Sequence, residues 1–142
     1  MLKLLVTTDG SDNANRAIDH VIKQAGRYRE PVEVHLLTVQ PVLAGVNVKL
    51  FINREDLNAY YHDEGMAALK SAREKLDAAG IKYAFHIGVG HPAEVIAQYA
   101  EDKQCEQIVT GSRGLGTMSN LVLGSVATKV IHLAKVPVLL VK

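Results

Sequence analysis

The stretch LKLLVTTDGSDN, residues 2 to 13, sets the fold of this 142-residue chain. Its apolar part, residues 2 to 8, is short and runs into DGSDN, which is typical of a buried strand followed by a turn and the start of a helix. Ser11 can cap that helix, because a serine hydroxyl accepts a hydrogen bond from an N–H of the first helical turn. The stretch therefore predicts a strand followed directly by a helix.

The rest of the chain continues this alternation. Runs rich in apolar and β-branched residues predict strands, and apolar residues three and four positions apart predict amphipathic helices. After the first strand, the predicted order is a helix over 12–27, a strand over 31–39, a helix over 54–79, a strand over 81–89, a helix over 92–103, a strand over 106–110, a helix over 126–134 and a strand over 136–142. Because these strands are apolar enough to be covered on both faces, they indicate one α/β domain, residues 1–142, with a five-stranded parallel sheet.

Composition limits the kinds of function. The 16 basic and 15 acidic residues are spread along the chain, so no basic stripe favours nucleic acid as a partner. The apolar run at Leu4-Leu5-Val6 is too short for a signal peptide or a membrane span, and we expect no membrane association. A single cysteine, Cys105, cannot form an internal disulfide, which fits a reducing compartment. Together these features predict a cytoplasmic protein.

A second informative stretch is GSRGLGTMSNLVLGS, residues 111 to 125, which connects a predicted strand to a predicted helix. In an open parallel sheet, ligands bind beyond the carboxyl ends of the strands. The helix that opens near Ser125 offers unpaired N–H groups and the positive end of its dipole, both of which favour an anion. Gly111, Gly114 and Gly124 allow the backbone to approach a phosphate without a Cβ in the way. The stretch therefore predicts a phosphate-binding loop.

Two common phosphate motifs do not fit. A Walker A motif requires a lysine where this chain has Thr117. A dinucleotide fingerprint is nominally present at GVGHPA, residues 88 to 93, but it follows the third predicted strand and the next strand ends without an acid for a ribose. We therefore interpret Gly88 as a turn residue, like Gly10 and Gly80.

The spacing G-x2-G-x9-G-S over residues 111–125, together with the opening TDGS at 8–11 and the closing PVLLVK, resembles the universal stress proteins, specifically their nucleotide-binding branch. The resemblance covers essentially the whole chain. It implies a Rossmann-like, five-stranded parallel sheet of order 3-2-1-4-5 between helices. It also implies ATP as the ligand.

The resemblance further implies which residues contact the nucleotide, grouped by the part of the ligand that each meets. They are Thr8 and Asp9 beside the ribose or adenosine, Val39 at adenine through its backbone, Gly111 and Gly114 at ribose and phosphate, and Gly124, Ser125 and Val126 along the phosphate chain. Where the family often has a second hydroxyl, this chain has Ala127, with Thr128 as the neighbour that could substitute. Because no lysine neutralises the triphosphate, we expect Mg²⁺ or Mn²⁺ to accompany ATP.

Several structural alternatives stay open. Asp9 could cap the first helix or stabilise the turn, and Ser125 could be an ordinary N-cap that accepts from the N–H of Thr128. Arg113, in the loop, could pair with phosphate oxygens or be solvated. The apolar segment 41–53 could be a flap over adenine, a partner-binding surface or a strand extension.

The resemblance implies a dimeric, ATP-dependent regulator of the stress response. In the strand order that it implies, residues 136–141 form an edge strand of the sheet, and an apolar edge strand favours a homodimer joined through its own copy. An efficient phosphotransferase needs a positioned base, a cationic clamp and metal ligands, and the sequence shows no such set. A slow ATPase or phosphotransferase, and a dimeric scaffold that binds no nucleotide, are the alternatives.

Overall fold

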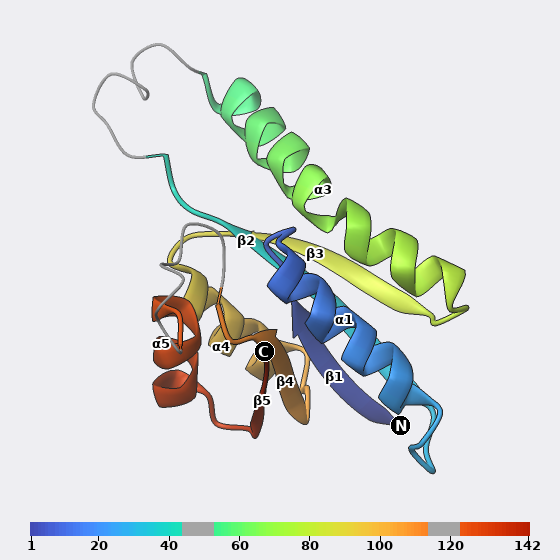
Figure 1. Ribbon diagram of the computed structural model, residues 1–142. Coiled ribbons are helices and arrows are strands. Elements are labelled where there is room, and N and C mark those ends of the chain that lie inside the picture. The colour runs from blue at the N-terminus through green and yellow to red at the C-terminus, as the bar shows by residue number, and fades with distance from the viewer. Residues whose placement is uncertain (44–52, 114–122) are drawn as a thin grey trace.

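The computed structural model describes residues 1–43, 53–113 and 123–142 (Figure 1). The elements alternate along the chain as the sequence predicts. In order they are β1 (Leu2–Thr7), α1 (Asp12–Ala25), β2 (Val32–Gln40), α3 (Arg54–Ala78), β3 (Tyr83–Val89), α4 (Pro92–Asp102), β4 (Gln107–Gly111), α5 (Ser125–Leu133) and β5 (Val138–Val141).

The strands form one parallel sheet of order β3-β2-β1-β4-β5, which confirms the predicted fold class and order. Helices α1 and α3 cover one face, and α4 and α5 cover the other (Figure 1). All carboxyl ends therefore lie at one end of the sheet, where α1, α4 and α5 begin.

The core has two apolar layers because successive side chains of a strand point to opposite faces. On β1, Leu4 and Val6 pack toward α1 and α3, whereas Leu5 packs with Ile108 on the side of α4 and α5. The registers Leu4 with Val34 and Leu5 with His35 extend the same alternation to β2. Strands covered on both faces read as nearly continuous apolar runs, which explains the sequence of residues 2 to 7.

The helix boundaries follow local chemistry. Ser11 is the N-cap of α1, with its Oγ accepting from the N–H of Ala14 at 3.1 Å. Pro92 is the first residue of α4, and α3 ends just before Gly80, whose φ of +69° is left-handed. The interpretation of Gly88 as a turn residue is wrong, because Gly88 lies inside β3. A Cβ there would lie 2.7 Å from Cγ1 of Val95, so the glycine lets α4 pack closely on the strand.

Buried threonine hydroxyls differ in how they are satisfied. The Oγ1 atoms of Thr7 and Thr110 are 2.6 Å apart and join β1 to β4 inside the protein. The Oγ1 of Thr38 on β2 is also buried but has no hydrogen-bond partner among the described residues. An unpaired buried hydroxyl lowers stability, because it loses water without gaining a protein partner.

We expect Thr38→Val to raise the free energy of unfolding by about 1 kcal/mol, because it keeps the side-chain shape and removes the unpaired hydroxyl. The matched control is Thr7→Val, which breaks the bond to Thr110 and should lower stability by a similar amount. Urea denaturation of both variants measures the difference. If Thr38→Val is the less stable of the two variants, the hydroxyl of Thr38 has a hydrogen-bond partner in solution and the prediction is wrong.

Candidate functional site

A cleft of about 630 Å³ opens at the carboxyl ends of β1, β2 and β4. It lies where the chain order of the sheet reverses, since β1 has β2 on one side and β4 on the other. This is the position at which open parallel sheets bind ligands. The cleft is lined by residues 7–10, 14, 37, 39–41, 64, 67, 68, 92, 96, 110, 111, 113 and 124–127.

The structure brings the predicted site residues together around this cleft. They come from the ends of β1, β2 and β4 and from the start of α5, and they are Thr8, Asp9, Val39, Gly111, Gly124, Ser125 and Val126. The eighth predicted residue, Gly114, lies outside the described residues, as does most of the apolar segment 41–53. Side chains up to 118 positions apart in the sequence thus share one cavity.

The turn after β1 is held by its own side chains. The Oδ1 of Asp9 accepts from the N–H of Ser11 at 2.9 Å, and the Oγ1 of Thr8 accepts from the N–H of Gly10 at 3.1 Å. Gly10 has a φ of +85°, and a Cβ there would lie 3.3 Å from the backbone oxygen of Ala68. Asp9 therefore has the turn-stabilising role expected as an alternative, at the edge of the cleft.

The start of α5 differs in detail from the prediction. Gly124 is the N-cap and Ser125 the first helical residue, so the alternative of Ser125 as an N-cap is wrong. The backbone oxygen of Gly124 accepts from both the N–H and the Oγ1 of Thr128, at 3.1 Å and 2.9 Å. Because a glycine cap has no side chain, no cap side chain accepts from the opening N–H groups of α5. The side chain of Ser125 is exposed beside them.

Asn13 is a structural residue that the sequence analysis missed. It is buried at the start of α1, where its Oδ1 accepts from the N–H of Arg113 at 2.8 Å and its Nδ2 donates to the backbone oxygen of Val141 at 3.2 Å. A Cβ on Gly111 would collide with that Oδ1. The sequence did contain an indication that Asn13 is buried, because it lies one helical turn before Ala17, on the face of α1 that packs against the core.

The far walls of the cleft come from helices that no motif marked. Glu64, Ala67 and Ala68 of α3 close one side, and Pro92 and Ile96 of α4 close another. Arg113, which the sequence left between a ligand role and solvation, also lines the cleft. The small alanine side chains leave room, and the charged side chains among the described lining residues are Asp9, Glu64 and Arg113.

These features define an α/β protein with a cleft at the topological switch point of a parallel sheet. The model of the Universal stress protein family matches residues 1–142. The chain belongs to that family, as the sequence resemblance predicted.

Individual relatives agree with this assignment. Universal stress protein MJ0531 of Methanocaldococcus jannaschii is 34% identical over 140 residues, covering 99% of this chain and 81% of the relative. The solved structure of hypothetical protein MJ0577 superposes with a TM-score of 0.80 at 32% identity, covering 99% of this chain and 94% of that one.

Two solved relatives contain nucleotides. A universal stress protein in complex with cAMP has a TM-score of 0.69 at 25% identity, covering 99% of this chain and 96% of its own. The universal stress protein from Archaeoglobus fulgidus in complex with dAMP has a TM-score of 0.68 at 25% identity, covering 100% of this chain and 98% of its own. Both ligands are adenine nucleotides.

We expect Asn13→Asp to destabilise the protein by about 2 kcal/mol near neutral pH, because a buried carboxylate would face the backbone oxygen of Val141. Acidification should restore part of the loss, since a protonated carboxyl can donate to that oxygen. The measurement is urea denaturation at several pH values. The matched control is Asn15→Asp on the same helix, which keeps the oxygen that accepts from Ser71; equal losses in the two variants would contradict the role of Asn13.

Proposed function

We propose that this protein binds an adenine nucleotide, ATP, in the cleft and acts as a dimeric, nucleotide-dependent regulator of the stress response. The observation that carries the proposal is the convergence of residues from β1, β2, β4 and α5 on one cleft. The cAMP and dAMP complexes of two relatives support an adenine nucleotide as the ligand class. ATP itself is what the resemblance of the glycine-rich loop to the nucleotide-binding branch of the family implies.

The dimensions of the site suit this ligand. A cleft of about 630 Å³ lies within the range of pockets that enclose a small molecule. The start of α5, whose N-cap Gly124 has no side chain, supplies N–H donors and the positive end of the helix dipole for phosphate. Three or four charge-assisted hydrogen bonds of ~1.5–3 kcal/mol each, less the cost of association, can sustain the ~8 kcal/mol of a micromolar complex.

The α5 contacts also bear on the triphosphate. Ala127 is buried and has no hydroxyl to offer. Thr128 is a poor substitute, because its single hydroxyl proton is already donated to the backbone oxygen of Gly124. This supports the expectation that Mg²⁺ or Mn²⁺ accompanies ATP and neutralises charge that the side chains leave uncompensated.

We infer that the dimer forms through β5, an edge strand of the sheet. The odd-numbered residues of this segment direct their backbone hydrogen bonds toward β4, since the backbone oxygens of Pro137 and Val141 accept from the N–H groups of Ile108 and Ser112. The N–H and oxygen of Leu140 therefore point to the open edge. Two copies of β5 pairing about a two-fold axis would satisfy both edges.

The proposed setting is the cytoplasm. In the part of the chain that the structure describes, no helix combines the length and the apolar character needed to cross a membrane. The alternatives to a regulator are a slow ATPase or phosphotransferase, which would turn over ATP with Mg²⁺, and a scaffold that binds no nucleotide. The glycine spacing of the loop speaks against the scaffold.

We expect Ser125→Ala to weaken ATP binding about tenfold, because it removes one hydrogen bond to a charged group, worth ~1.5 kcal/mol. Gly114→Val should weaken it more, since a branched side chain would block the backbone from the phosphate. Calorimetric titration with and without a metal chelator measures both effects and the contribution of Mg²⁺.

Ser71→Ala, on α3 outside the lining of the cleft, is the matched control and should bind ATP like the unmodified protein. Circular dichroism checks that each variant is folded. Unchanged affinity in Gly114→Val would remove the phosphate role of the loop. Unchanged affinity in chelator would remove the metal from the proposal.

We expect Leu140→Pro to convert the dimer to a monomer in analytical ultracentrifugation, because proline removes an outward N–H without breaking a bond to β4. Leu140→Thr keeps the N–H and should stay dimeric. Substitutions at Leu139 or Val141 would not test the dimer alone, since both side chains pack against the core beside α1 and their loss would also affect folding. A dimer that survives Leu140→Pro places the interface elsewhere.

A further inference from the structure

A pair of histidines lies on the sheet, outside the cleft. The Nδ1 of His35 on β2 is 3.0 Å from the Nε2 of His86 on β3, and the two rings are nearly parallel, with centroids 5.3 Å apart. The other nitrogen of His35, Nε2, is 2.9 Å from Oε2 of Glu33. The His35 side chain is only 12% exposed, so water competes little for these bonds.

The geometry limits how many protons the pair can hold. One nitrogen must donate and the other accept, so a single proton lies between the rings. A neutral His35 donates to Glu33 and accepts from His86. A cationic His35, with a proton on each ring nitrogen, donates to both Glu33 and His86, and the carboxylate of Glu33 balances its charge. When both rings are protonated, two N–H groups face each other and the bond between them is lost.

The surroundings oppose the second proton. Burial, followed by the charges of His35 and Lys103, holds the pKa of His86 below its usual value. The hydrogen bond from His35 lowers the pKa of Glu33, which therefore stays ionised and orients His35. Among the described residues, the Met1 amine, Lys3 and Cys105 interact electrostatically with Glu33, and Tyr99 contacts His86.

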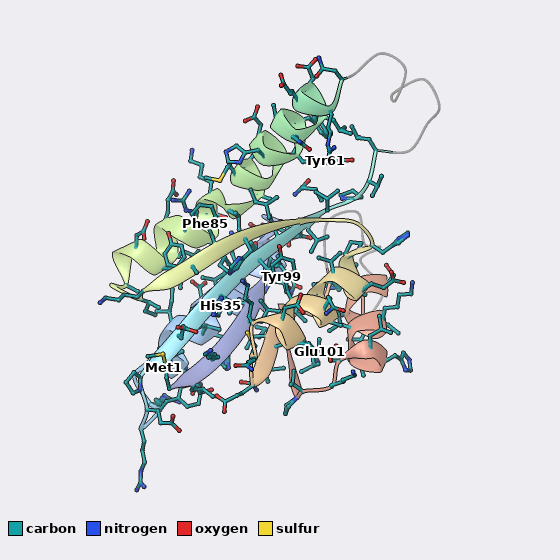
Figure 2. All side chains as sticks on the ribbon, turned by 180° about the vertical axis from the view of Figure 1, so that it is seen from behind. Met1, His35, Tyr61, Phe85, Tyr99 and Glu101 are labelled. Carbon is teal, nitrogen blue, oxygen red and sulfur yellow. The ribbon has the colours of Figure 1, made fainter. Side chains whose placement is uncertain are left out.

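The pair is in contact with a helix that also lines the cleft. The His86 ring lies 5.5 Å from the ring of Tyr99 on α4, at an angle of 57°. In Figure 2, which views this face, His35 and Tyr99 lie close together over the sheet. One turn before Tyr99, Ile96 of the same helix lines the cleft. His86 therefore contacts a helix that also forms part of the cleft wall.

We propose that His35 and His86 form an acid-sensitive latch between β2, β3 and α4. The hydrogen bond between the two rings is intact while the pair carries at most one positive charge, and it is lost when both rings are cationic. The latch uses only residues outside the lining of the cleft and does not depend on the nucleotide proposal. His86 is favoured as the neutral form in the folded protein and titrates near pH 6.5 when unfolded. Its contribution to stability is therefore complete above about pH 6.5 and is lost as the pH falls through the lower, folded-state pKa.

The direct test is an NMR titration of the imidazole nitrogens in the unmodified protein from pH 8 to pH 5. We expect the signals of His86 to titrate below the usual histidine range, and the Nδ1 signal of His35, which lies 3.0 Å from His86, to change in the same step. Amide hydrogen exchange in β3 and around Tyr99 should accelerate with this step. A His86 titration that leaves the Nδ1 signal of His35 unchanged would overturn the proposal, and this measurement requires no variant to fold.

Variants provide a second test. His86→Gln can still hydrogen-bond to His35 but does not titrate, so its free energy of unfolding should fall less than that of the unmodified protein between pH 7.5 and pH 5. His132→Gln, at an exposed position on α5, is the matched control and should keep the full pH dependence. Identical pH profiles for His86→Gln and the unmodified protein would contradict the latch.

Discussion

The rest of the structure depends on the central position of β1, with β2 on one side and β4 on the other. Right-handed crossovers that step in one direction place α1 and α3 on one face, and the return across β1 places α4 and α5 on the opposite face. The connections after β1 and β4 therefore diverge and leave a crevice between them. The cleft is therefore a consequence of the path of the chain and does not require a gap in the packing of the core.

The side chains of two threonines and one asparagine connect neighbouring elements beside that crevice. The hydroxyls of Thr7 and Thr110 join β1 to β4, and Asn13 joins α1 to the ends of β4 and β5. Gly111 is explained by packing, because a Cβ there would collide with Oδ1 of Asn13. At this position the requirement for glycine is structural before any ligand is considered.

The cleft and the histidine pair lie at different places on the sheet and share α4. Pro92 and Ile96, in the first half of the helix, belong to the cleft, and Tyr99 in the second half contacts His86. A rigid helix of eleven residues transmits a shift at one end to the other more readily than a loop would. The chemistry at the two places differs, since one is built from backbone donors and small residues and the other from imidazoles and a carboxylate.

The sequence by itself determined the alternation of strands and helices, the Ser11 cap, the start of α4 at Pro92 and the glycine-rich connection before α5. These features depend on neighbours within a few residues, where periodicity, capping and proline geometry act. The strand order came from the resemblance to the family and was confirmed by the structure. The three-dimensional structure was needed to identify the partners of Asn13, the close packing of Val95 against Gly88, the α3 wall of the cleft and the pairing of His35 with His86. Asn13 bonds to Arg113 and Val141, and His35 to His86, across 51 to 128 positions of the sequence. A pattern of local periodicity contains no information on which distant side chains the packing of strands and helices brings together.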